Sequence, residues 1–167
     1  MPEIWTIGHS NHSVEHFLHL LSMHGITAVA DVRSTPYSIA ASQFNREAIK
    51  EVLHKERIYY VHLGEELGPR SPDPACYENG KVVYGLLAAT AVFAQGIERL
   101  RKGMERYRVA MMSAEKDPIA CHRMVLICRH LSMHADDGLA IRHILEDGAI
   151  EDNAASERRL MQDPKIA

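Results

Sequence analysis

Short apolar runs alternate with amphipathic segments along the chain, and this alternation restricts the fold most. The runs at 26–31 and 109–113 are too short for helices and suit strands that are buried on both faces. Between such runs, apolar side chains recur at helical spacing, as in Val14, Phe17 and Leu21. The resulting order of alternating strands and helices predicts an α/β fold, a single domain with a mostly parallel central sheet and helices on both faces.

The element boundaries follow from turn and cap residues. We expect strands at 3–8, 26–31, 58–63, 109–113 and 141–145, and helices at about 13–25, 45–57, 84–107 (long or broken) and 118–133. The segment 64–80 is rich in proline and glycine and is expected to be a surface loop of the kind that often binds ligands. Residues 1–150 form the single α/β domain in this interpretation, and 151–167 form a polar C-terminal tail that is a weak helix or frayed.

Composition excludes several classes of protein. The chain has 167 residues and a net charge of -3, which gives no strong field toward polyanions. Its three cysteines form no CxxC pair, so we expect a reducing compartment rather than a disulfide framework. No window approaches the ~18 consecutive apolar residues of a membrane span, and the first residues do not resemble a signal peptide. These features predict a cytoplasmic protein without membrane attachment.

Polar side chains gather where three of the predicted strands end. They follow the first strand at 8–11, the second at 31–34 and the fourth at 115–123. The carboxyl ends of parallel strands meet at one edge of a sheet, where ligands bind in open α/β folds. A helix that opens near Pro118 would direct unpaired N–H groups and a positive dipole end at an anion, which Arg33 and Arg123 could grip.

These side chains suggest roles in catalysis. Cys121, in the first turn of the expected helix, would be favoured as a thiolate by the dipole and by neighbouring cations. Asp31 and Glu115 are candidate acid/base groups, with His9 or His122 as proton carriers near neutral pH.

Each assignment has a structural alternative. Cys121 shares a helical stripe with apolar residues and could be a small core residue, which we weigh equally with a functional thiol. Asp31 and Arg33 lie on the same side of a strand and could form an internal ion pair. His122 and Arg123 could be merely exposed to solvent.

Metal binding ranks below a metal-free site, and no cofactor is predicted. His12, His16 and His19 are spaced along one helical face, but that face is expected to meet water. A mixed site of Cys121, His122, His9 and Asp31 is the stronger metal candidate, yet no ligand motif of known spacing appears. Gly-rich dinucleotide, Walker and Gly-x-Ser-x-Gly motifs are also absent from the sequence.

Four segments together resemble a known family across nearly the whole chain. They are the stretches 6–11, 31–36 with Phe44-Asn45, 60–64 with Leu67-Gly68, and 114–118 with 121–123. The chain resembles the bacterial and archaeal domain-of-unknown-function family 488, which is regarded as a compact α/β domain without an established activity. By position, the resemblance implicates a set of residues: His9, Ser10, Asp31, Arg33, Pro36, Phe44, Glu115, Cys121, His122 and Arg123.

Two positions depart from the family pattern. Ser113 stands where family members commonly have a cysteine before Ala-Glu, so a mechanism that needs a thiol there does not carry over. Pro69 replaces a glycine often seen after Leu-Gly, which points to a different ligand specificity.

The leading functional hypothesis is a small enzyme that acts on a phosphate-bearing nucleotide or nucleic-acid-derived ligand. Asp31, Glu115, His9, His122 and Cys121 would carry the chemistry. The ligand-binding side chains would be Ser10, Arg33, Pro36, Phe44, Lys116 and Arg123. The alternatives are a non-catalytic module that binds an anion or nucleotide, and a metal-dependent hydrolase.

Overall fold

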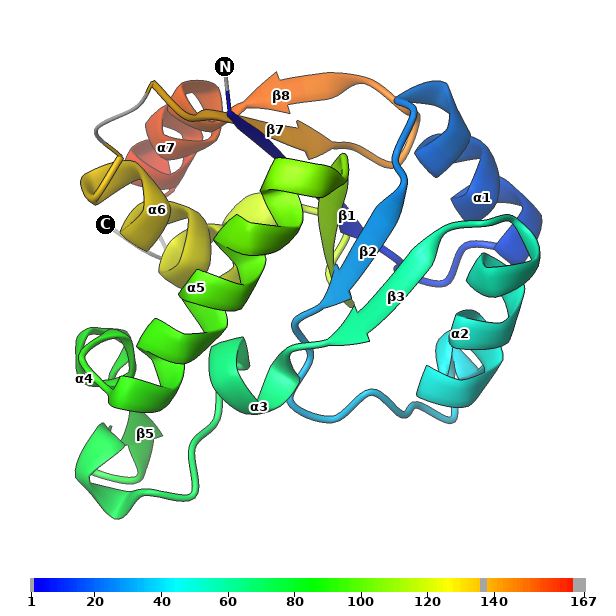
Figure 1. Ribbon diagram of the computed structural model, residues 1–167. Coiled ribbons are helices and arrows are strands. Elements are labelled where there is room, and N and C mark those ends of the chain that lie inside the picture. The colour runs from blue at the N-terminus through cyan, green and yellow to red at the C-terminus, as the bar shows by residue number, and fades with distance from the viewer. Residues whose placement is uncertain (1, 136–137, 164–167) are drawn as a thin grey trace.

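A twisted sheet of six strands forms the centre of the molecule (Figure 1). The computed structural model describes residues 2–135 and 138–163. The strands lie in the order β3-β2-β6-β1-β7-β8. Their bounds are β1 Glu3–Gly8, β2 Ala28–Asp31, β3 Tyr59–His62, β6 Val109–Ser113, β7 Ala140–Ile144 and β8 Ile150–Asp152. The first five are parallel and β8 runs antiparallel to β7, so the predicted α/β architecture is confirmed.

Two apolar layers cover the sheet because side chains alternate between its faces along each strand. Trp5 and Ile7 face α1 (Val14–Met23) and α2 (Arg46–Lys55), where they meet Phe17 and Leu53. Ile4 faces the opposite layer. That layer is built from α3 Gly64–Leu67, α4 Tyr84–Ala88, α5 Ala91–Arg106 and α6 Arg129–Met133.

Two expected elements differ in detail. The predicted loop 64–80 contains α3 and begins a small hairpin, β4 Tyr77–Glu78 with β5 Lys81–Val82. The helix expected over 84–107 is broken between α4 and α5, where the Thr90 hydroxyl accepts a hydrogen bond from the Phe93 N–H and starts the second helix.

The prediction of a helix that begins at Pro118 is wrong for its first residues. Pro118–Ala120 is a single 3-10 turn, and the Asp117 carboxylate accepts the N–H of Ile119 there. Cys121 is extended, with φ -136° and ψ 143°, and ends that turn. A π-helical turn, Arg123–Cys128, follows and leads into α6.

The C-terminal segment packs against the sheet as far as residue 163. β8 pairs with β7, and α7 (Asn153–Gln162) buries Ser156 and Leu160. Arg129 binds Glu157 through its guanidinium, which ties α7 to α6. The rest of the expected tail, 164–167, lies outside the described residues.

A glycine ends β1 because the chain crosses directly over it. A Cβ atom at Gly8 would overlap the carbonyl of Glu115 and crowd the Cα of Lys116. The close approach brings the segment after β6 down onto the end of β1.

We predict that Gly8→Ala lowers the free energy of unfolding by about 2–4 kcal/mol, because backbone must move to admit the methyl group. Gly85→Ala is the matched control: a Cβ there meets nothing within 4 Å, and its position inside α4 favours alanine. Urea denaturation of both variants measures the difference. Equal stability of the two would contradict the close approach.

Candidate active site

The ends of β1, β2 and β6 meet at one edge of the sheet, as the strand order requires. His9 and Ser10 donate backbone hydrogen bonds to Ser113 and Ala114, and Val32 donates one to Met112. Three segments distant in the sequence therefore form one polar surface.

Asp31 and Arg33 form a closed ion pair beside this surface. Arg33 Nε and Nη2 donate to the two carboxylate oxygens of Asp31 at 2.9 and 2.8 Å, and the Arg33 N–H donates to the same group. Tyr60, from β3, adds a hydrogen bond of 2.5 Å to Asp31 Oδ2. Burial and this contact raise the pKa of Tyr60 well above its usual range. Asp31 is completely buried, so the geometry favours the structural alternative for this pair.

His9 supports the pair and does not face the solvent. Arg33 Nη1 donates to His9 Nε2 at 3.2 Å, and His9 Nδ1 donates to the Ser10 carbonyl at 2.7 Å. The ring stacks on Phe44, with 4.7 Å between the centroids. Burial lowers the pKa of His9 to about 4, and the charge of Arg33 lowers it further against the effect of the Ser10 contact. His9 is therefore neutral at pH 7, with both ring nitrogens occupied.

Cys121 has the surroundings of an ionisable thiol. Its sulfur lies 2.9 Å from Ser113 Oγ and 3.6 Å from His122 Nδ1, and the Arg123 N–H donates to it at 3.4 Å. Burial opposes ionisation, but the contacts with His122, Arg123 and Ser113 outweigh it and lower the pKa of Cys121 to about 7. The fully buried Cys128 differs, since burial raises the pKa of its thiol. Cys128 is a core residue.

His122 is oriented to take the proton of this thiol. The Val32 carbonyl can only accept a hydrogen bond, so His122 Nε2 carries a hydrogen and donates it at 2.8 Å. The other ring nitrogen, Nδ1, then faces the sulfur and can receive its proton. A nucleophile, a base and a group that orients the base are the three parts of an activated cysteine site.

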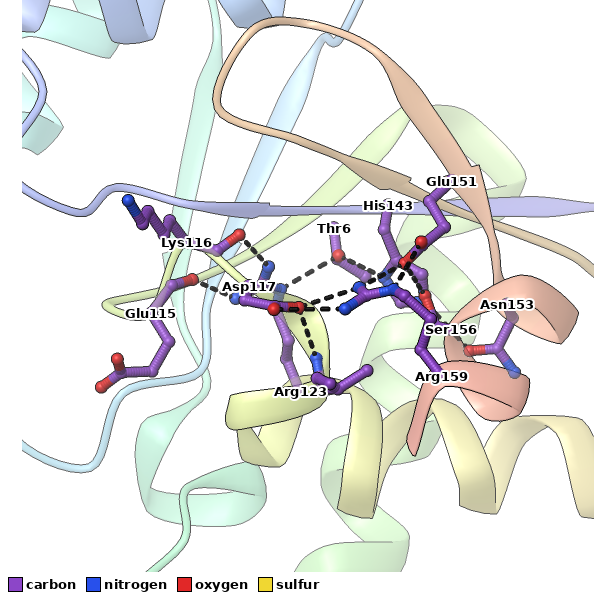
Figure 2. Close-up of polar contacts among 11 residues, drawn as sticks. Thr6, Glu115, Lys116, Asp117, Arg123, His143, Glu151, Asn153, Ser156 and Arg159 are labelled. Atoms are coloured by element: carbon purple, nitrogen blue, oxygen red, sulfur yellow. Dashed lines mark hydrogen bonds and ion pairs between the residues drawn. The ribbon is translucent and has the colours of Figure 1, made fainter. Parts of the chain in front are cut away.

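Arg123 is buried behind the thiol and is 0% exposed. Its guanidinium donates to Thr6 and to the carbonyls of Glu115 and Lys116 (Figure 2). It also donates to the Ser113 hydroxyl. No carboxylate lies within ion-pair distance of it among residues 2–135 and 138–163. We expected Arg123 to grip an anion, but its position makes it a buried cation next to the thiol.

Cys121 and His122 line a cavity of about 470 Å³, a volume within the range of ~300–1,000 Å³ typical of small-ligand sites. The polar side chains that line it come from three loops: Arg33, Ser34, Thr35, Arg70, Ser113, Glu115, Cys121 and His122. Arg70 and Glu115 are exposed and take part in no ion pair within the described parts of the chain.

The remaining predicted site residues lie outside this cavity. Ser10 adopts a left-handed φ of 46° and shapes the turn after β1. Pro36 is buried, and its carbonyl accepts the Arg46 N–H. Lys116 points away and pairs with Glu146 at 3.2 Å.

Four polar residues of the cavity were not assigned to the site from the sequence. Ser34 and Thr35 stand in the motif after β2, Ser113 was noted only as a departure from a family pattern, and Arg70 lies in the predicted loop. The expectation that 64–80 contributes to binding was the one signal that could have found Arg70.

The histidine-rich helix does not gather metal ligands. The rings of His12 and His16 pack edge to face, with 4.8 Å between their centroids. His16 Nε2 donates a hydrogen bond to the Glu146 carbonyl. Within residues 2–135 and 138–163, no three His, Cys, Asp or Glu side chains are grouped so that they could hold a metal ion.

Fold and site together define a small α/β protein with a buried thiol at the carboxyl edge of its sheet. The chain belongs to the family described as "Domain of unknown function DUF488", whose profile matches residues 13–129. No curated protein and no solved structure matches it significantly. No helix in the described part of the chain is long and apolar enough to cross a membrane.

We predict that Asp31→Asn lowers the free energy of unfolding by about 3 kcal/mol or more, because it leaves the buried Arg33 without a counter-charge. Tyr60→Phe removes one neutral donor from the same carboxylate and should cost only about 1 kcal/mol. Chemical denaturation of both variants tests the ranking. A smaller loss for Asp31→Asn than for Tyr60→Phe would contradict a structural role for the ion pair.

We also predict that iodoacetamide modifies Cys121 with a pH midpoint near 7, below the ~8.5 of an ordinary thiol. Ser113→Ala should raise the midpoint, because the thiolate loses a hydrogen-bond donor. Mass spectrometry of the alkylated peptides separates the three buried cysteines. Cys121 lines the cavity, whereas Cys76 and Cys128 do not and should not react in the folded protein. A midpoint at the ordinary value would refute the proposed activation of the thiol.

Proposed function

We propose that this protein is a thiol-dependent enzyme, with Cys121 as nucleophile and His122 as its base, acting on a small anionic ligand. The observation that carries the proposal is the set of contacts around the Cys121 sulfur, which Ser113, His122 and the Arg123 N–H surround, in a residue that lines a cavity. A core cysteine needs neither the neighbouring base nor the cavity.

The anion is proposed to bind at the outer part of the cavity. Arg70 supplies an exposed guanidinium there, and Ser34 and Thr35 supply hydroxyl groups. Guanidinium and hydroxyl groups suit a phosphate, which is the reason to favour a phosphate-bearing nucleotide or nucleic-acid-derived ligand. Arg33 contributes less charge because Asp31 neutralises it.

The carboxylates divide between two tasks. Asp31 holds Arg33 and the loop after β2, so we assign it a positioning role in place of the acid/base role expected from the sequence. Glu115 lines the cavity with an exposed carboxylate and is the acid/base group of the proposal.

The proposed reaction is hydrolysis through a covalent intermediate. His122 Nδ1 takes the Cys121 proton, and the sulfur electron pair forms a bond to an electrophilic carbon of the ligand. The bond from that carbon to the leaving group breaks, its electron pair stays on the leaving group, and that group takes the proton from His122. Water, deprotonated by His122 or Glu115, then attacks the same carbon. The carbon–sulfur bond breaks, its electron pair returns to the sulfur, and the proton taken from water restores the Cys121 thiol.

We predict that Cys121→Ser abolishes turnover but preserves binding of a nucleoside monophosphate, while Arg70→Ala weakens binding about tenfold or more, the loss expected for one charge-assisted hydrogen bond. Calorimetry measures binding, and intact-mass spectrometry detects the covalent adduct during turnover of phosphorylated esters and amides. Lys50→Ala, an exposed cation on α2, is the control for nonspecific charge.

Three outcomes decide between the hypotheses. Loss of the adduct and of turnover in Cys121→Ser supports the enzyme. Tight binding without turnover of any ligand by the unmodified protein would favour the non-catalytic binding module. Turnover that survives in Cys121→Ser would refute the thiol mechanism.

A further inference from the structure

Arg123 is the centre of a hydrogen-bond network that joins the thiol to the C-terminal part of the chain. Figure 2 shows the part of this network that runs from Arg123 to His143 and Asn153. Arg123 Nε donates to Thr6 Oγ1 at 3.0 Å and Nη1 donates to Ser113 Oγ at 2.8 Å. Thr6 also contacts His143 Nδ1 at 2.7 Å, and His143 Nε2 contacts Asn153 Oδ1 at 3.0 Å. The last two residues lie beyond the family match, which ends at residue 129.

The chemistry of the partners decides the direction of these bonds. Arginine can only donate, so the oxygens of Thr6 and Ser113 both accept from Arg123. A thiolate has no proton to give, so Ser113 donates to the Cys121 sulfur when the thiol is ionised. The direction of the bond between Thr6 and His143 depends on which ring nitrogen of His143 carries the hydrogen.

His143 completes the network in its neutral form. Asn153 Oδ1 can only accept, so the hydrogen of the neutral ring is on Nε2. Nδ1 is then left to accept from the Thr6 hydroxyl. Burial lowers the pKa of His143 to about 4, the Asn153 contact opposes this, and the charge of Arg123 lowers it further. A protonated His143 would put a second buried cation beside Arg123.

A second connection holds the loop above Arg123. Arg159 on α7 donates to both Asp117 oxygens, at 3.2 and 2.9 Å, and also to Glu151. Asp117 directly follows Glu115 and Lys116, whose carbonyls accept from Arg123. The C-terminal segment therefore supports Arg123 from two sides.

We propose that Thr6 and His143 are positioning residues for Cys121: with β8 and α7 behind them, they orient the Arg123 guanidinium so that Ser113 donates its proton to the sulfur. The catalytic meaning of this arrangement rests on the proposed function. The arrangement itself acts on the ionisation of the thiol, which can be measured without any substrate.

A change at Thr6 or His143 removes no other charged or titratable group near Cys121. His122 and Arg123 directly follow Cys121 in the chain. Burial raises the pKa values of Tyr84 of α4 and of Cys128, and the charge of the nearby Cys121 thiolate raises them further. Arg33, Arg70 and Glu115 line the same cavity. A change at Thr6 leaves all of these side chains in the protein, so a shift of the Cys121 midpoint reports on the network.

The test compares Thr6→Val with Thr6→Ser. Valine keeps the shape but removes the acceptor for Arg123 Nε, whereas serine keeps the hydroxyl. We expect Thr6→Val to raise the pH midpoint of Cys121 alkylation by about one unit. This shift corresponds to a roughly tenfold smaller thiolate fraction at pH values well below the midpoint. We expect Thr6→Ser to keep the midpoint of the unmodified protein. A purely structural role would leave the midpoint of the folded variant unchanged.

His143→Phe provides a second variant that keeps a ring but has no acceptor for Thr6. It should shift the midpoint in the same direction, and circular dichroism confirms that each variant is folded. Unchanged midpoints in folded Thr6→Val or, if that variant does not fold, in folded His143→Phe would overturn the network. A shifted midpoint in a protein without turnover for any ligand would instead leave the network standing and remove the proposed function.

Discussion

The arrangement of the segments around the site depends on the buried guanidinium of Arg123. A charge removed from water must be compensated, and Arg123 has only neutral oxygens as direct partners among the described residues. They come from β1, β6 and the loop after β6, so these three segments have to converge. The convergence requires Gly8, because the Glu115 carbonyl occupies the space of a side chain there. The position of Cys121 over the end of β6 follows from the same arrangement.

The strand pattern predicted the sheet and the edge where the site lies, because buried parallel strands are recognisable from short apolar runs such as 26–31. The partners of Asp31 were not predictable in the same way. Its spacing from Arg33 fits either an ion pair or a binding site, and the contact that favours the ion pair comes from Tyr60 on another strand. A contact between residues so far apart in the sequence leaves no periodic signal.

Local signals misled the prediction near Cys121. Asp117 and Pro118 are good residues for a helix start, and they do start one turn. The turn then ends at Cys121, which has an extended backbone. The Arg123 N–H donates a hydrogen bond to the Cys121 sulfur there. Tertiary contacts of Arg123 therefore prevail over local propensity. The sequence did not identify Ser113 as a site residue for a related reason. Its hydroxyl contacts Cys121 and Arg123, and neither contact can be recognised from the sequence.

The charges of the site favour the ionised form of Cys121, and they bear on where the proposed anionic ligand would lie. Arg33 is neutralised by Asp31, and burial keeps His9 and His143 neutral, with pKa values of about 4. The positive charge of Arg123 is thus left for the sulfur to balance. An anion bound directly against Cys121 would oppose that ionisation. An anion beside Arg70 would be paired with that guanidinium, which is the reason that the proposed function places the ligand there and not against the sulfur.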